Sequence, residues 1–285
     1  MEELIKSLVP VRSQETIYED DYRRGSDGLL VCGVCGMPKE QLLQLPSELY
    51  QATINCKCEQ DEFDKKKEQE RTAKYKANVE RLKERGLRSK MDLDKTFKHD
   101  DSPDSTASKV ARFYAENFEE MLETNTGLYF SGPVGTGKTF YALCIANAVA
   151  EKERSIWVTS LTELVNAMQG FEEEERRNIL KRVRSVDLLI LDDVGVERST
   201  DFVNEQVQLI VDTRYQSNKP LIVASNLTPE DLANTTNANE RRSADRINEM
   251  ASYEIQVKGN SRRADMAKSK KKDFYKNFIE RMGKE

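Results

Sequence analysis

The sequence predicts an α/β domain built around a parallel β-sheet, preceded by a small cysteine-bearing module and a charged helix. Two cysteine pairs lie near the start of the chain, and a charge-rich segment without proline follows them. Over the remaining chain, short apolar runs alternate with segments of helical spacing, which is the pattern of a parallel sheet flanked by helices. We place the module at residues 1–63, the helical linker at 64–95 and the α/β domain at 96–285.

Composition restricts the classes of protein to which the chain can belong. Charged residues make up 33% and apolar residues 38% of its 285 positions, which favours a soluble protein with a sizeable core. No apolar run approaches the roughly 20 residues that span a bilayer, and the first residues lack a secretion-signal pattern, so we expect a cytoplasmic protein without a membrane partner. The net charge of −5 excludes a global basic surface, so any nucleic-acid contact would come from a local patch.

A glycine-rich loop is the strongest motif of the sequence. Residues 132–139 read GPVGTGKT and fit the phosphate-binding pattern G-x-x-x-x-G-K-[ST], between an apolar run and an apolar, helix-like segment. Its members are Gly132, Pro133, Val134, Gly135, Thr136, Gly137, Lys138 and Thr139. Glycines let the backbone turn its N–H groups toward phosphates, and the helix that follows adds its dipole. We expect the loop to bind ATP or ADP, with Lys138 on the β-phosphate and, in ATP, the γ-phosphate, and with Thr139 as a ligand of Mg²⁺.

A second motif lies where an apolar strand ends in two adjacent carboxylates. Residues 188–191 are apolar, and Asp192 and Asp193 follow them directly. Two acids at a buried strand end are costly unless a cation offsets them, which indicates a site for metal and nucleotide. We expect Asp192 to hold Mg²⁺ through its water shell and Asp193 to orient and polarise the attacking water. Asn226 ends a later apolar strand, and we expect it to help position that water from the same sheet edge.

The other elements of the α/β domain follow from periodicity and cap residues. We expect strands at residues 128–130, 156–159, 186–191, 220–225 and 253–257. We expect helices at residues 107–123, 140–150, 161–169, 171–184, 202–216 and 228–233, and a terminal helix at 268–285. In the helix at 228–233, Thr228 would be the cap and Pro229 the first residue.

The four cysteines near the N-terminus have the spacing of a structural zinc site. Cys32 and Cys35 form a C-x-x-C pair, and Cys56 and Cys58 form a closer C-x-C pair further along the chain. Four thiolates in two pairs supply the tetrahedral ligand set that Zn²⁺ prefers, and bound zinc would let a segment too small for its own core hold a fold. A redox pair, free thiols and disulfides are the alternatives, and a redox pair would leave Cys56 and Cys58 unexplained.

Other residues carry weaker signals. Residues 61–90 are dense in charge of both signs, so we interpret them as a solvated spacer helix that ends at Gly86, with a nucleic-acid-binding helix as the alternative. The single histidine, His99, lies in a polar stretch and is expected on the surface. Cys144 lies in the apolar segment after the phosphate loop and is expected to be a buried thiol.

Four segments, in this order, resemble a known family. GLYFSGPVGTGKT, LLILDDVG, IVASNLTPEDL and RRSADRINEM…VKGNSRR are similar to motifs of the DnaC/DnaI/IstB-type AAA+ ATPases, the loaders of bacterial and phage replicative helicases and related transposition helpers. The resemblance covers roughly residues 96–265. It implies an AAA+ fold with a five-stranded parallel sheet, Mg²⁺-dependent ATP hydrolysis, and self-assembly into an oligomer in a bacterial cell or a phage host. The cysteine module resembles the small zinc domain with which some loaders grip the helicase.

The resemblance also assigns roles to residues near the sheet edge and the C-terminus. Asn226 matches the sensor-1 position. Arg246 matches the arginine finger, which reaches the γ-phosphate of a neighbouring subunit, and Arg242, one turn earlier, is a second candidate. Arg263 matches a sensor-2-like position, although Arg262 stands where the family has an aromatic residue.

We therefore expect an ATP-dependent loader of the replicative DNA helicase, a hexamer of the DnaB family, onto single-stranded DNA. The zinc module would hold the helicase, the charged helix would tether it, and Lys181, Arg182 and Arg184 are the candidates for DNA contact. The alternative is an IstB-like ATPase subunit that assists DNA transposition. A non-catalytic nucleotide-binding adaptor is disfavoured because the lysine and both carboxylates of the two motifs are present.

Overall fold

The computed structural model describes residues 20–46, 48–170, 173–195, 200–259, 261–262 and 274. The chain divides into two compact units, Met1–Lys76 and Ala77–Glu285, and each is described separately below. Arg263 and, apart from Phe274, the expected terminal helix at 268–285 lie outside the described residues. Within the part of the chain that is described, no helix is both long enough and apolar enough to cross a membrane.

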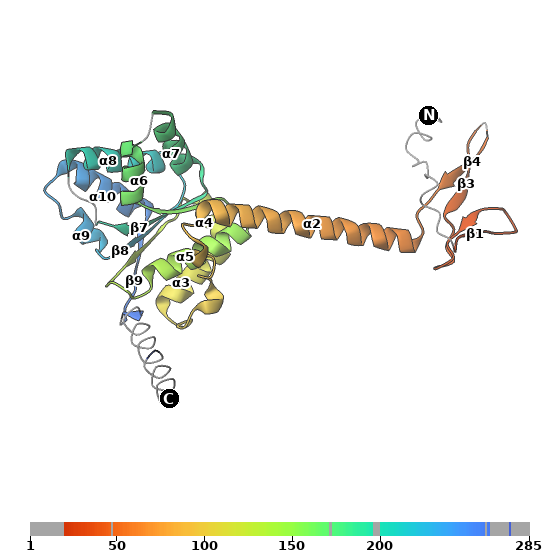
Figure 1. Cartoon of the computed structure of the whole chain (residues 1–285), viewed down its shortest axis with the longest axis horizontal. Coiled ribbons are helices and arrows are strands. Elements are labelled where there is room, and N and C mark those ends of the chain that lie inside the picture. Colours follow the sequence, from red (N-terminus) through yellow and green to blue (C-terminus); the bar gives the residue numbers. More distant parts are fainter. Residues whose placement is uncertain are drawn as a thin grey trace, which may run out of the picture. The chain divides into compact units, whose positions relative to one another are not determined.

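The first unit consists of two small hairpins and the beginning of a helix (Figure 1). Strand β1 (Tyr22–Arg23) pairs with β2 (Leu30–Val31), and β3 (Glu40–Gln44) pairs with β4 (Leu49–Thr53), both antiparallel. The helix α2 (Lys57–Gly86) begins at the residue after Cys56, so that Cys58 lies in its first turn. The described apolar core of this unit is small, and comprises Leu29, Leu30, Val31, Cys32, Leu45, Ala52 and Cys56.

The second unit is built on a five-stranded parallel sheet in the order β6-β7-β8-β5-β9. Its strands are β5 (Leu128–Ser131), β6 (Ile156–Ser160), β7 (Leu188–Val194), β8 (Leu221–Ser225) and β9 (Tyr253–Gln256). Every residue of β5 and β8 is buried, as expected for central strands covered on both faces. The five-stranded α/β fold that the sequence predicted is confirmed.

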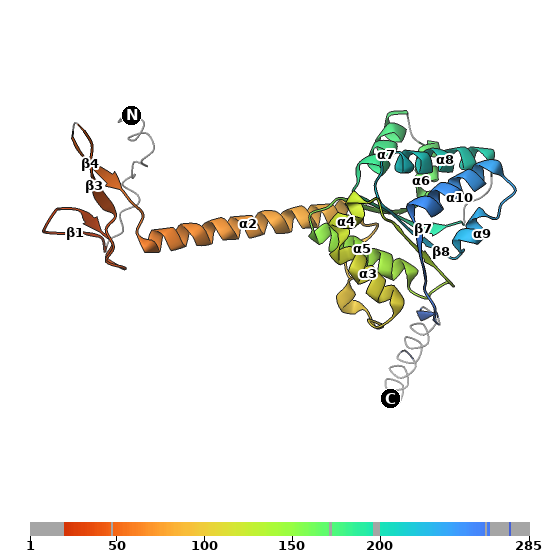
Figure 2. The same cartoon turned by 180° about the vertical axis from the view of Figure 1, so that it is seen from behind.

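Helices cover both faces of this sheet (Figures 1 and 2). On one face, α3 (Thr106–Glu116) and α5 (Lys138–Glu151) pack over an apolar cluster that includes Phe130 and Ile190. On the other face, a second apolar cluster lies under α6 (Leu161–Gly170), α7 (Glu173–Ser185), α8 (Asp201–Tyr215) and α10 (Ala238–Met250). The short helix α9 (Pro229–Ala233) begins with a capping box between Thr228 and Asp231, so its predicted start is confirmed.

One helix that was predicted as continuous is divided into two in the structure. The sequence predicted a single helix over residues 107–123, but the structure has α3, ending at Glu116, and a separate α4 (Phe118–Glu123). The break lies at Asn117, whose backbone leaves the helical region with φ −103° and ψ 27°. The Asn117 side-chain amide donates to the Phe113 carbonyl at 2.8 Å, so it competes with the backbone for a helical acceptor.

The register of the sheet brings the sequence motifs to one edge. Asp192 of β7 pairs with Ala224 of β8, and Phe130 of β5 pairs with the same Ala224. The carboxyl ends of these three parallel strands therefore lie side by side, and the residues that follow them share one edge of the sheet.

The segment that precedes the sheet is firmly anchored in the second unit. The C-terminal part of α2 contributes the buried Val79, and Leu82 and Leu87 pack against the apolar cluster under α3 and α5. Two single turns follow, η2 (Lys90–Asp92) and η3 (Phe97–His99). The helix ends at Gly86, as predicted. A Cβ at this position would come within 2.6 Å of the Ile156 carbonyl oxygen, so the close approach to β6 requires glycine. The domain boundaries expected at residues 63 and 95 stay predictions.

Candidate nucleotide site and cysteine cluster

The phosphate loop connects β5 to α5 in a conformation that requires glycine. Gly132 has φ 136°, in the region that side-chain-bearing residues rarely adopt, and a Cβ there would lie 2.5 Å from the Val257 carbonyl oxygen. Gly137, with φ 110°, is the N-cap of α5, and Lys138 is the first residue of that helix. The loop therefore ends at a helix N-terminus, which attracts anions through its backbone N–H groups and its dipole.

The Lys138 ammonium lies between the loop and the end of β8. Lys138 is 6% exposed, and its Nζ donates to the carbonyl oxygens of Gly132 and Pro133, each at 2.8 Å. It also donates to Asn226 Oδ1 at 2.8 Å. The structure thus brings together two residues from separate sequence motifs, Lys138 and Asn226, and the ammonium connects the start of the loop to the end of β8.

Thr139 and Asp192 are also in contact. The Thr139 hydroxyl donates to Asp192 Oδ1 at 2.9 Å, and Asp192 is 4% exposed. Hydroxyl and carboxylate oxygens are ligands that Mg²⁺ accepts, and Thr139 directly follows the lysine that would bind the phosphates. The donor set therefore fits a magnesium–nucleotide site.

Asp193 occupies a bulge at the end of β7. The register between β7 and β8 shifts between Asp192 and Val194, and Asp193 has φ 53°. The bulge leaves Asp193 exposed while both of its neighbours are buried. Two adjacent carboxylates thus have different environments, one buried and hydrogen-bonded and the other open to solvent.

A pocket of about 490 Å³ lies beside the loop and was not predicted from the sequence. It is formed by the start of α3, by the strand β9 and by Arg262. The Arg262 side chain donates to Ser102 Oγ at 3.2 Å and pairs with Asp101 at 2.9 Å, and its backbone N–H donates to the Gly135 carbonyl at 2.9 Å. The pocket comes from segments about 150 residues apart, so no local pattern marks it.

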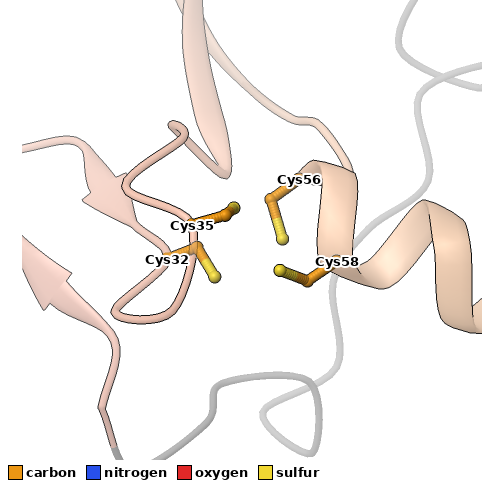
Figure 3. Close-up of side chains that lie close together, drawn as sticks. All are labelled: Cys32, Cys35, Cys56 and Cys58. Carbon is orange, nitrogen blue, oxygen red and sulfur yellow. The ribbon is translucent and has the colours of Figure 1, made fainter.

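The four N-terminal cysteines converge on one point (Figure 3). Their Sγ atoms all lie within 4.8 Å of one another, and the sulfurs point toward a common centre. Cys32 and Cys35 lie on the turn after β2, whereas Cys56 and Cys58 lie at the start of α2. Four sulfurs at about 2.3 Å from a tetrahedral zinc ion would lie about 3.8 Å apart, so this spacing fits a structural zinc site.

The surroundings of the cluster favour a thiolate at Cys35 and disfavour one at Cys56. The backbone N–H of Met37 lowers the pKa of Cys35 to about 6, and burial raises the pKa of Cys56 to about 12. A buried thiolate needs a positive partner, and a zinc ion at the centre of the cluster would be one. All four thiols are free in the structure, which agrees with the zinc and free-thiol interpretations rather than with disulfides.

Comparison with known proteins agrees with these motifs. The model of the family described as IstB-like ATP binding protein matches residues 47–271, which is most of the chain. The chain belongs to this family. The resemblance to the DnaC/DnaI/IstB-type AAA+ ATPases is thereby confirmed.

Relatives of this IstB-like protein include proteins named as helicase loaders. The replicative helicase loader DnaI of Bacillus subtilis (strain 168) is 32% identical over 147 residues, which are 49% of this chain and 46% of the relative. The replicative helicase loader DnaC of Escherichia coli (strain K12) is 29% identical over 132 residues, which are 44% of this chain and 51% of the relative. The chain thus spans about half the length of the curated relatives it matches.

Solved structures share the fold of about 60% of this chain. A crystal structure of DnaI superimposes with a TM-score of 0.52 and 25% identity, over 61% of this chain and 96% of that chain. A crystal structure of the DnaC helicase loader gives a TM-score of 0.50 and 23% identity, over 60% of this chain and 100% of that chain, and shows the fold alone.

The proposed finger of the IstB-like protein has partners within its own chain. Arg246 of α10 pairs with Asp212 of α8, and its guanidinium lies 5.3 Å from the ring centre of Tyr215. Arg242 is exposed, and the described residues give its side chain no hydrogen bond or ion pair. The roles of both arginines in a neighbouring site stay predictions, as does that of Arg263.

The remaining sequence expectations have mixed outcomes. His99 is exposed, and Cys144 is a buried thiol whose pKa is raised to about 12 by burial, so both expectations are confirmed. Lys181 and Arg184 are exposed, but the Arg182 guanidinium lies 4.0 Å from the ring centre of Trp157 and donates to the Arg85 carbonyl. DNA contact by these three residues stays a prediction.

Proposed function

We propose that this IstB-like protein is a Mg²⁺-dependent ATPase that loads the replicative DNA helicase onto single-stranded DNA. The observation that carries the ATPase part is the convergence of the Lys138 ammonium, the Thr139 hydroxyl and the Asp192 carboxylate at one sheet edge. These groups have the charges and positions that bind a triphosphate and its metal ion.

Each residue at the edge has a proposed task. Lys138 binds the β- and γ-phosphates, while the loop from Gly132 to Thr139 wraps them with its N–H groups. Thr139 and Asp192 hold Mg²⁺, which when bound neutralises the charge that develops on the phosphates. Asp193, exposed at its bulge, orients the attacking water, and Asn226 helps to position it. Arg246 of one subunit stabilises the transferring phosphoryl group in the site of the next, so that turnover depends on assembly.

The loader part is supported by the relatives and by the cysteine unit. Relatives with 29–32% identity are named as loaders of the replicative helicase. We propose that Cys32, Cys35, Cys56 and Cys58 bind a structural zinc ion, and that the unit so formed holds a helicase hexamer of the DnaB family. ATP or ADP in the AAA+ site then controls grip and release, with single-stranded DNA as the second partner.

Asp193→Asn tests the ATPase proposal in the full chain. It should lower the rate of ATP hydrolysis by about 10²–10⁴-fold, because an amide is a poor proton acceptor, while ATP binding changes little. The matched control is Asp201→Asn, which neutralises an exposed carboxylate of α8 and should leave both quantities unchanged. Hydrolysis of ATP at the original rate by the Asp193→Asn protein would reject the proposed role.

A second candidate function is assistance of DNA transposition, because the matching family model is that of IstB-like proteins. Capture experiments with the full chain separate the two functions, with a replicative helicase and a transposase as the alternative preys. We expect capture of the helicase, its loss in Cys32→Ser, and its retention in the control Cys144→Ser, whose thiol lies in the other unit. Capture of the transposase alone would favour the second function.

A further inference from the structure

Arg88 makes a contact that the proposed reaction does not explain. Its Nη2 donates to Asp192 Oδ2 at 2.7 Å, and the two residues form an ion pair in which the side chains are 28% and 5% exposed. The other oxygen of this carboxylate accepts the Thr139 hydroxyl. Both oxygens of the carboxylate proposed to hold Mg²⁺ are therefore already engaged, one of them by a permanent positive charge.

The segment that carries Arg88 is fixed in place. Gly86 packs closely against Ile156 of β6, as described above. The buried Asn147 of α5 donates to the carbonyl oxygens of Asp92 and Lys95, at 2.9 and 3.0 Å. Ser89 and Asp92 form a capping box on the turn directly after Arg88. A guanidinium presented by an anchored segment is a built feature of the site rather than a chance contact of a long side chain.

Other charges near Arg88 also favour its position. The negative charges of Asp92 and Glu163 act on its guanidinium together with that of Asp192. Glu163 lies in the first turn of α6 and is held by the Thr159 hydroxyl at 2.9 Å. The guanidinium thus occupies an acidic environment in which a divalent cation would be the competing positive charge.

We propose that Arg88 is a positioning residue that holds the Asp192 carboxylate until Mg²⁺ enters with nucleotide, and so sets the Mg²⁺ concentration that nucleotide binding requires. This inference rests on the proposed function. The guanidinium and Mg²⁺ carry charge of the same sign and interact with the same carboxylate, so each weakens the binding of the other. Because of this competition, Mg²⁺ does not bind to a site that holds no nucleotide. The negative charge of the phosphates is needed to offset the positive charge that Mg²⁺ adds beside the guanidinium.

The test is a titration of the full chain with Mg²⁺, in which binding of a fluorescent ATP analogue is measured. In Arg88→Ala the Mg²⁺ concentration at half-maximal binding should fall by about tenfold, the size expected when a competing charge-assisted hydrogen bond is removed. At saturating Mg²⁺ the affinity for the analogue should match that of the original protein. Arg88→Lys, which keeps a charge but loses the planar fork, should lie between the two.

Arg85→Ala is the matched control, because it removes an exposed guanidinium three residues earlier, in the last turn of α2. It should leave the Mg²⁺ midpoint unchanged. A second measurement is thermal unfolding: Arg88→Ala should lower the melting temperature without ligands, because Asp192 loses its counter-ion, but not in the presence of Mg²⁺ and nucleotide.

The outcomes separate this inference from the function on which it rests. If the original protein binds the analogue but Arg88→Ala has the same Mg²⁺ midpoint, Arg88 is only structural and the inference is overturned while the ATPase proposal stands. A uniform loss of affinity at every Mg²⁺ concentration also overturns it. If the original protein binds no analogue at any Mg²⁺ concentration, the proposed function fails and the inference fails with it.

Discussion

The two units of this chain are stabilised in different ways. In the second unit, two apolar clusters cover the faces of a five-stranded sheet, and the residues of β5 and β8 are all buried. In the first unit, the described core is a few residues around two short hairpins, and polar chemistry takes its place. Four thiols converge on one point, and the fully buried Lys39 pairs with Asp21 and, at 3.2 Å, with Glu59. A small unit can hold a fold with few apolar residues when a metal and buried charges connect its segments.

The largest expected effect is unfolding of the first unit while the second unit stays folded. Cys56→Ser removes one of the four proposed zinc ligands, and structural zinc in small domains contributes about 10 kcal/mol or more to folding. We expect residues 20–56 to lose protection from hydrogen exchange, while β7 of the second unit stays protected. Chelation of zinc should have the same effect, and Cys144→Ser should leave the first unit intact. Unchanged protection of residues 20–56 in Cys56→Ser would contradict the zinc proposal and remove the distinction between the units.

Lys39→Met tests whether buried charge contributes to the first unit alongside the metal. The substitution leaves Asp21 and Glu59 without their shared cation, and breaking a buried pair in this way costs about 3–5 kcal/mol. The free energy of unfolding of the first unit, followed by hydrogen exchange, should fall by that amount. Lys66→Met, at an exposed position of α2, is the control and should have no measurable effect. A stability within about 0.5 kcal/mol of the original would mean that the metal alone holds the unit.

Ile190→Ala applies the corresponding test to the second unit. Ile190 is a fully buried residue of β7 in the cluster under α3 and α5, and truncation of such a residue costs about 2–5 kcal/mol. The midpoint of urea unfolding of the second unit should decrease, while zinc content stays unchanged. Leu209→Ala, which shortens a side chain that is 42% exposed, should change the stability by less than about 0.5 kcal/mol. Release of zinc by Ile190→Ala would show that the units do not unfold separately.

The smallest expected effect on stability concerns one carboxylate of the second unit, that of Asp187. Burial alone would raise the pKa of Asp187, but hydrogen bonds from Ser155 and from Lys219 lower it below its ordinary value of 3.8. A lowered folded-state pKa contributes stability that is present above pH 3.8 and is lost as the pH falls through the folded-state value. Asp187→Asn should therefore be less stable by about 1 kcal/mol at neutral pH.

The difference between Asp187→Asn and the original protein should disappear below the folded-state pKa of Asp187. Urea unfolding at several pH values between 7 and about 2 measures this convergence. Glu205→Gln, which neutralises an exposed carboxylate of α8, is the control and should follow the original protein throughout. A constant difference at all pH values would mean that the amide disturbs packing rather than charge.

The features that could be predicted from the sequence are those whose functional residues lie close together along the chain. The phosphate loop occupies residues 132–139, and its glycines, lysine and threonine act together because they are contiguous. The acidic pair near the end of β7 was predicted for the same reason, and the C-x-x-C and C-x-C spacings indicated a cluster before its geometry was known. The break at Asn117 was missed because apolar periodicity continues through it, while the side chain of Asn117 binds the backbone instead.

By itself, the sequence determined the fold class, the family and the residue types of the site. Only the tertiary structure decided which of those residues meet, and with what. Arg88 and Asp192 are 104 positions apart, and the pocket beside the loop joins α3 to β9. Lys39 could not be distinguished from the exposed lysines of α2 until two carboxylates surrounded it. The reason is physical: backbone patterns depend on near neighbours, whereas the partner of a charge is whatever group the packing of distant segments brings within hydrogen-bonding distance.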